Sequence, residues 1–193
     1  MAIALTINFP GLLKINLLMQ NDLNFEYWTR AQVNQDFNNL MNYLNNPIQR
    51  ALNFDYLYLS NRGINHFKDV KFLFQLNYSL LAFTSGILFY LKWKSYILPK
   101  EVIGVTKFIK WSLISICLTA LLFFQKSFVI FHRLFFSNND WIFDEQTDPI
   151  INFLPQTFFL FCFLLILFIS ILTLTLVHRL FNKKEEVNSI EEV

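Results

Sequence analysis

One uncharged run constrains this chain more than any other feature of its sequence. Residues 153–176 contain no Asp, Glu, Lys, Arg or His. A helix needs about 20 apolar residues to cross the hydrocarbon core of a bilayer. A helix is also the structure that satisfies its own backbone hydrogen bonds in lipid. We therefore predict a transmembrane helix over residues 153–177.

Two further apolar runs reach a similar length, and they predict transmembrane helices over residues 67–91 and 111–136. The composition agrees, because only 16% of the residues are charged whereas soluble domains carry about 25%. Phe alone contributes 24 of the 193 residues. We predict an all-α integral membrane protein, a bundle of three full transmembrane helices with a small extracytoplasmic cap.

The N-terminus adds a shorter apolar stretch that Pro10 and Gly11 interrupt. Residues 1–11 are too few to span a bilayer. We interpret them as the end of a truncated first transmembrane helix, while a short interfacial helix is the alternative.

Basic residues set the predicted orientation. The loop over residues 92–110 contains five lysines and one glutamate, and the tail over residues 178–193 begins with His178 and Arg179. The positive-inside rule places both segments in the cytoplasm. Residues 12–66, the cap segment, and the loop over residues 137–152 are then extracytoplasmic. The net charge of +2 leaves no basic stripe for nucleic acid.

The cap segment carries local folding signals of its own. Thr29 and Gln32 have the spacing of a capping box, and the apolar residues that follow recur at helical intervals until Asn45. Residues 54–59 are aromatic and prone to β structure, so we predict one short strand there.

Two histidines on the predicted outer side are the candidates for chemistry. His66 opens the first long helix, with Asn65 as a plausible N-cap, and Asp69 lies three residues further on the same face. His132 lies where the second span leaves the membrane, and an ionisable group at that depth is a functional candidate. The His66–Asp69 pair also fits a simple helix cap. Common nucleophile and metal-ligand motifs are absent, which leaves imidazole acid–base chemistry.

These residues resemble a known family. The run His66-Phe67-Lys68-Asp69-Val70-Lys71 is similar to the His-x-x-Asp-Val-Lys motif of the bacterial lipoprotein intramolecular transacylases (Lit). Residues 131–159 resemble the second block of that family, and the order of the blocks matches as well. The matching positions in this block are Phe131-His132, Phe135-Phe136, Asn138, Trp141, Asp144, Asp148, Leu154-Pro155 and Phe158-Phe159.

The resemblance implies a reaction and a location. Lit enzymes are small membrane proteins of low-GC Gram-positive bacteria, multi-pass in the cell membrane, with the active site on the extracytoplasmic side. They move the sn-2 acyl chain of a diacylglyceryl-modified lipoprotein to the α-amino group of its N-terminal cysteine, which gives the lyso form. The resemblance implies no cofactor and no metal. We expect the protein to bind its lipoprotein substrate and membrane lipid, but no nucleic acid. We also expect it to be a monomer.

The resemblance also implies roles for individual residues. His66 and His132 become the catalytic pair, one as base and one as acid, in an order that the sequence leaves open. Asp69 is expected to orient His66, while Asn138 and Trp141 shape the site around His132. Lys71 and Asp144 are further supporting residues.

Two other function classes stay open at the level of sequence. A non-catalytic membrane accessory or lipoprotein-binding protein would not depend on the two histidines. A transporter or channel subunit would need polar residues aligned inside the spans, and the last span offers almost none.

Overall fold

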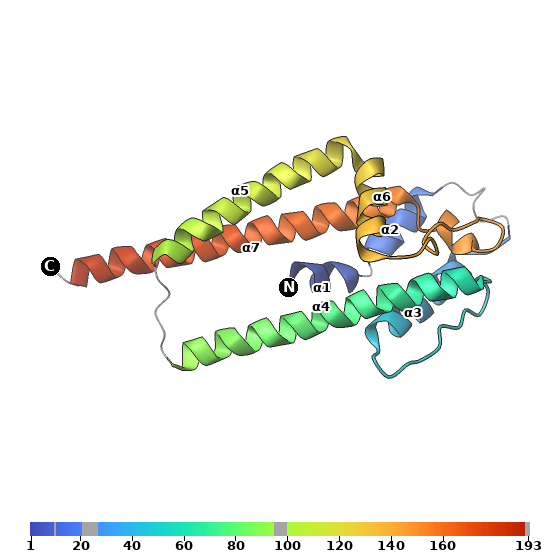
Figure 1. The fold of residues 1–193 in the computed structure, drawn as a ribbon, viewed down its shortest axis with the longest axis horizontal. Coiled ribbons are helices and arrows are strands. Elements are labelled where there is room, and N and C mark those ends of the chain that lie inside the picture. Colours follow the sequence, from blue (N-terminus) through green and yellow to red (C-terminus); the bar gives the residue numbers. More distant parts are fainter. Residues whose placement is uncertain (10, 21–26, 95–99, 192–193) are drawn as a thin grey trace.

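The computed structural model describes residues 1–9, 11–20, 27–94 and 100–191, and every regular element in these ranges is helical. Figure 1 shows the arrangement. In chain order the elements are α1 (Ala2–Ile7), α2 (Gly11–Met19), α3 (Arg30–Asn45), α4 (Asn61–Trp93), α5 (Lys100–Leu122), α6 (Phe124–Phe135), the 3-10 helix η2 (Pro149–Asn152) and α7 (Gln156–Glu191).

Three of these helices are long and apolar enough to cross a membrane, as predicted. The candidate spans are Asn61–Leu91 in α4, Val105–Leu122 in α5 and Gln156–Leu176 in α7. Many of their large apolar side chains lie on the outer surface, among them Phe83 and Phe89 on α4. In water such a surface would be costly, but it suits contact with lipid. The fold is therefore that of an all-α, multi-pass membrane protein.

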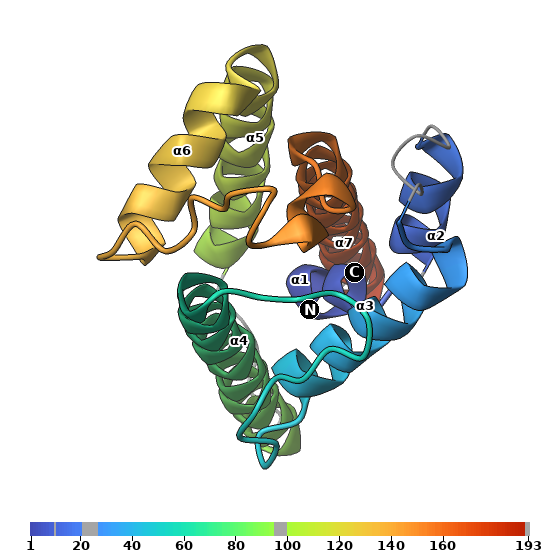
Figure 2. The same ribbon diagram turned by 90° about the vertical axis from the view of Figure 1, so that its right-hand side faces the viewer.

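The N-terminal residues form two short helices instead of one continuous element. α1 packs chiefly against α7 and also contacts α4, so it lies between the long helices (Figures 1 and 2). The Asn8 amide donates to the Tyr78 hydroxyl at 2.7 Å, and that hydroxyl donates to Asn45 Oδ1 at 2.5 Å. This chain of polar contacts connects the end of α1 to α4 and to the end of α3.

The predicted helix over residues 111–136 is wrong, because the chain breaks there into two helices. α5 already begins at Lys100 and ends at Leu122, and α6 then leaves at a steep angle to it (Figure 1). Phe123 lies at the break with a non-helical backbone (φ −126°, ψ 40°). A straight continuation would carry Lys126 and Arg133 along the membrane span, where charges are costly. The bend instead places α6 across the end of the bundle, in contact with α5 and α7.

The helices also extend beyond the predicted cytoplasmic boundaries. Residues 100–110 of the expected loop belong to α5, and α7 continues to Glu191 through most of the expected tail. At the other end of that loop α4 continues to Trp93, and residues 95–99 lie outside the described residues.

The predicted helix in the cap segment is confirmed as α3. The Thr29 hydroxyl accepts the Gln32 N–H and the Gln32 side chain accepts the Thr29 N–H, which completes the capping box. The helix buries Val33, Leu40 and Leu44 and ends at Asn45.

The strand predicted over residues 54–59 is wrong. The backbone N–H groups there donate to one buried carboxylate, Asp36 on α3, and not to a neighbouring strand. Asp55 and Leu57 each donate at 2.6 Å, and Tyr56 donates at 3.0 Å. Asp36 is fully buried, so this loop is fastened to α3 by its backbone.

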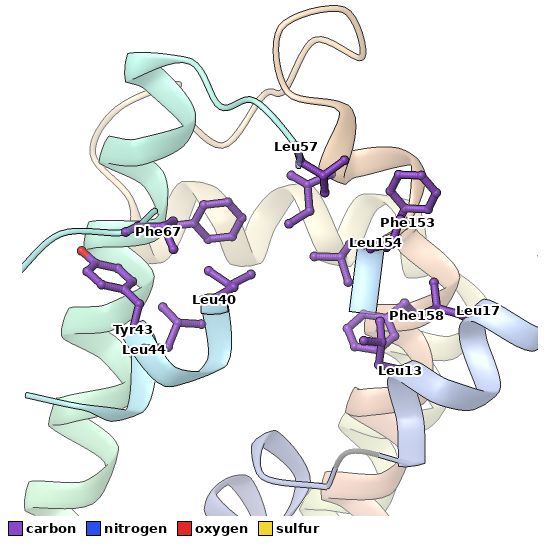
Figure 3. Close-up of a cluster of buried hydrophobic side chains, with 13 residues drawn as sticks. Leu13, Leu17, Leu40, Tyr43, Leu44, Leu57, Phe67, Phe153, Leu154 and Phe158 are labelled. Atoms are coloured by element: carbon purple, nitrogen blue, oxygen red, sulfur yellow. The ribbon is translucent and has the colours of Figure 1, made fainter. Parts of the chain in front are cut away.

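A hydrophobic cluster joins the cap to the long helices (Figure 3). Leu13 and Leu17 of α2 meet α7 and the segment before it, while α3 contributes a second group of side chains that reaches α4. The buried members of the cluster include Leu40, Tyr43, Leu44, Leu57, Phe67, Phe153, Leu154 and Phe158. Because α3 packs against α4, and its Phe37 contacts Phe158 of α7, this core connects the two long helices through the cap.

Candidate active site

The first turn of α4 determines where His66 lies. The helix begins at Asn61, so Asn65 is inside it and the predicted N-cap is wrong. Ser60 has the capping role instead, because its hydroxyl accepts the Gly63 N–H at 3.0 Å. His66 therefore lies in the second turn, where its side chain is buried.

A buried carboxylate anchors this turn to the segment that precedes α7. Asp148 accepts the Ser60 N–H and the Ser60 hydroxyl, both at 2.8 Å, and the Thr147 hydroxyl at 2.8 Å. Only 2% of Asp148 is exposed. The start of α4 is thereby fixed against a part of the chain 88 residues away.

Gly63 allows Asp148 to approach the helix this closely. A Cβ atom at Gly63 would lie 2.4 Å from Asp148 Oδ1 and 2.7 Å from Leu59 Cδ1. We expect Gly63→Ala to destabilise the protein by about 1–3 kcal/mol, because the hydrogen-bonded carboxylate cannot move away freely. Thermal unfolding in one detergent would measure the effect.

Gly86→Ala is the matched control for that substitution. Gly86 lies on the same helix, and a Cβ atom there would meet no atom within 4 Å. In a helix interior alanine is more stabilising than glycine by roughly 0.5–1 kcal/mol, so this variant should be unchanged or slightly more stable. Equal unfolding temperatures for the two variants would contradict the steric argument.

His132 is on α6 and is held by its own helix. Its Nδ1 lies 2.7 Å from the Phe128 carbonyl oxygen. A carbonyl oxygen only accepts hydrogen bonds, so Nδ1 carries the proton and Nε2 of the neutral ring keeps a lone pair. The side chain is buried, with 9% of the residue exposed.

The bend after α5 brings the two histidines together. Their ring centroids lie 6.0 Å apart, and their planes make an angle of 31°. Phe136 contacts both rings, at 4.8 Å from His66 and 5.6 Å from His132. Phe143 lies 5.3 Å from His66. Among the described residues, His66 Nδ1 is a buried nitrogen with no hydrogen-bond partner. The site is therefore a pair of imidazoles enclosed by aromatic side chains.

The protonation state of His132 suits a base. Burial lowers its pKa below the ordinary value, and the hydrogen bond to Phe128 opposes this effect in part. Its ring lies on α6, outside the three candidate spans. The lowered pKa keeps His132 neutral at pH 7, so Nε2 is available to accept a proton.

Asp69 has a different partner from the one predicted. Among the described contacts its carboxylate has no hydrogen bond to His66, and Asp69 Oδ2 instead accepts the Asn138 side-chain amide at 2.9 Å. His66 and Asp69 are both on α4, three residues apart, as the spacing indicated. The hydrogen bond of Asp69, however, connects α4 to the segment after α6.

Trp141 lies against His132, and Asn138 contacts Trp141. The Trp141 ring centroid is 4.8 Å from that of His132, at an interplanar angle of 32°. Trp141 Nε1 donates to the Asn138 carbonyl oxygen at 3.1 Å.

Arg62 is a contributor that the sequence did not reveal. Its guanidinium donates to the Asn139 carbonyl oxygen at 2.6 Å and lies 3.4 Å from the Asp140 carboxylate. This contact is a second link between α4 and the segment after α6. Its charge pairing is exposed and contributes little to stability by itself.

Two of the predicted supporting residues lie elsewhere. Lys71 donates to the Gln49 carbonyl oxygen and lies 4.3 Å from the centre of the Tyr43 ring. It therefore connects α4 to the cap and not to the histidines. Asp144 is exposed, and its carboxylate accepts the Gln146 N–H at 2.8 Å within a turn.

Two of the aromatic walls were also missed by sequence reasoning. Phe128 could have been found, because it lies one helical turn before His132, but Phe143 could not be separated from the many other Phe residues by any local signal. Phe136 was matched by the resemblance but was given no role. Among the described residues, no group of three or more His, Cys, Asp or Glu side chains is placed to hold a metal ion.

Comparisons with known proteins agree on one family. The family model of the lipoprotein intramolecular transacylase Lit matches residues 1–159. A solved in meso structure of the membrane-integral Lit from Bacillus cereus is similar at a TM-score of 0.69 and 26% identity, covering 96% of this chain and 93% of that one. A structure of the same protein with a histidine-to-arginine mutation gives a TM-score of 0.61 and 28% identity, covering 97% and 90% of the two chains. No curated protein sequence matched significantly.

Proposed function

The chain belongs to the lipoprotein intramolecular transacylase family and is an acyltransferase, and on that premise we propose which acyl chain it moves. The sn-2 chain of a diacylglyceryl-modified lipoprotein passes to the α-amino group of the N-terminal cysteine. The product is a lipoprotein with an N-acyl group and a lyso-glyceryl group.

The observation that carries this proposal is the pair of buried imidazoles. His66 and His132 lie 6.0 Å apart and come from helices that are distant in the chain. An O-to-N acyl shift needs one proton removed from the amine and one proton delivered to the leaving oxygen. Two neighbouring imidazoles, each with one nitrogen that can accept a proton and one that can donate, suit both tasks.

The hydrogen bond of His132 supports a division of roles. Because Nδ1 is committed to the Phe128 carbonyl, Nε2 accepts the proton that the attacking amine loses. His66 has a buried nitrogen with no hydrogen-bond partner among the described residues. It takes this proton from His132 and delivers it to the glyceryl oxygen as the acyl C–O bond breaks and the new C–N bond forms at the same carbonyl carbon. Both rings then return to their neutral state.

The remaining rate enhancement comes from proximity. Amine and ester belong to one substrate molecule, so holding them together makes the reaction intramolecular at the site. No external acyl donor enters this reaction. The protein supplies orientation, proton transfer and a setting from which aromatic side chains exclude water.

The membrane supplies the surroundings for the acyl chains. α6 exposes apolar side chains next to His132, including Phe131, Leu134 and Phe135. Acyl chains of the substrate lie against this surface and in the surrounding lipid. The positive-inside rule puts this end of a monomeric protein on the extracytoplasmic side of the bacterial cell membrane.

A lipopeptide with two different chains tests the proposal. The purified protein in lipid vesicles is given a diacylglyceryl peptide with palmitoyl at sn-1 and oleoyl at sn-2. Tandem mass spectrometry should find oleoyl on the α-amine and palmitoyl left on glycerol. N-palmitoyl product would contradict the sn-2 assignment, and an unchanged diacyl peptide would contradict transfer. A peptide with an acetylated α-amine is the control and should not react.

A further inference from the structure

Asn138 connects two parts of the site that are far apart in sequence. Its side-chain nitrogen donates to Asp69 Oδ2 at 2.9 Å, and its side-chain oxygen accepts the Asp140 N–H at 3.0 Å. With the oxygen occupied by a backbone donor, the amide nitrogen must face Asp69. Asp69 therefore holds Asn138 in one orientation.

Asn138 in turn holds the ring that lies against His132. Its backbone carbonyl oxygen accepts Trp141 Nε1–H at 3.1 Å. The Trp141 ring contacts the His132 ring at 4.8 Å and 32°, which is a tilted stacking arrangement. A continuous series of contacts thus runs from α4 to the base proposed above.

Trp141 is one of the rings that restrain His132. The Phe128 carbonyl fixes Nδ1, and the rings of Phe128 and Phe136 lie 4.2 and 5.6 Å from the imidazole. Trp141, at 4.8 Å, is the one of these rings that is connected to Asp69. A small misplacement of a catalytic group can cost about 100-fold in rate, so this restraint matters for the reaction.

We propose that Asp69 is a positioning residue for His132, acting through Asn138 and Trp141, and that its role requires a hydrogen-bond acceptor and not a negative charge. This inference rests on the proposed function, because it assumes that His132 takes part in acyl transfer. It differs from the expectation that Asp69 serves His66 on its own helix.

Two substitutions at Asp69 separate the acceptor from the charge. Asp69→Asn keeps an oxygen that can accept from Asn138, so we expect activity within about 5-fold of the unaltered protein. Asp69→Ala removes the acceptor, and kcat should fall roughly 10- to 100-fold with little change in KM. If the asparagine variant loses as much activity as the alanine variant, the charge is what matters and the inference is wrong.

An exchange of the two side chains gives a second test. Asn138→Asp alone sets two carboxylates against each other, and kcat should fall as in Asp69→Ala. The double variant Asp69→Asn/Asn138→Asp restores the bond with donor and acceptor exchanged, so activity should recover at least partly. A double variant no better than Asn138→Asp would overturn the inference.

Hydrogen–deuterium exchange gives a readout that does not depend on activity. The Asp140 N–H is bonded to Asn138, so a peptide covering residues 137–143 should exchange faster in Asp69→Ala and normally in Asp69→Asn. Glu145→Gln, an exposed change close to the same segment, is the control and should leave both exchange and activity unchanged. If the unaltered protein forms no N-acyl product, the proposed function fails and exchange alone decides the positioning role. Equal exchange of residues 137–143 in the unaltered protein, Asp69→Ala and Asp69→Asn would then contradict the positioning role.

Discussion

Replacing either His66 or His132 by alanine should nearly abolish acyl transfer. General acid–base catalysis by one positioned group contributes about 100- to 10,000-fold, so the rate should fall by that factor. The double variant should lose little more than the worse single variant, because the two rings act as a unit in one proton transfer. Mass spectrometry of the lipopeptide product after fixed times measures the loss.

Controls are needed because both rings are buried, and alanine leaves a cavity in either place. His66→Gln and His132→Gln keep most of the volume and the polarity but cannot exchange a proton near pH 7, so they should be as inactive as the alanine variants. His178→Ala, a change of the third histidine far along α7, should retain activity. If His132→Gln still formed N-acyl product at the normal rate, His132 would not be the base.

The long helices could be predicted from the sequence because their signal is local and repeated. The uncharged run in α7 and the capping box at Thr29 each depend on residues that are neighbours in the chain. The break between α5 and α6 has no signal at the residue where it occurs, since apolar residues continue through Phe123 and Phe124. Lys126 and Arg133 shortly after it were the available signal, because charges are costly inside a span.

In the candidate site, too, some features could be predicted from the sequence and others could not. The chain contains only three histidines, so the two on one predicted side could be paired from the sequence alone. The partner of Asp69 could not be predicted from spacing. Asp69 lies three residues from His66, and this spacing suggested a contact between them. The observed hydrogen bond of Asp69 is instead to Asn138, 69 residues away.

Buried carboxylates were the largest omission, because their partners are also distant. Asp148 bonds to Ser60 across 88 residues, and Asp36 bonds to the loop 19 to 21 residues later. In the sequence Asp36 looks like an ordinary charged residue of a polar segment, and the resemblance matched Asp148 without giving it a role. In the structure each carboxylate accepts hydrogen bonds from backbone N–H groups of a distant segment that would otherwise lack an acceptor.

Asp36→Ala is therefore expected to have the largest effect on stability. The substitution leaves the N–H groups of Asp55, Tyr56 and Leu57 without their acceptor in a part-buried loop. Each orphaned donor costs about 1–3 kcal/mol, so the variant should lose roughly 3 kcal/mol or more. For a chain of this size that lowers Tm by about 6–12 °C in thermal unfolding. Asp55→Asn, an exposed change on the same loop that keeps an acceptor for Asn39, should shift Tm only slightly. If Asp36→Ala melted together with Asp55→Asn, the buried carboxylate would not be what holds the loop over residues 54–59 to α3.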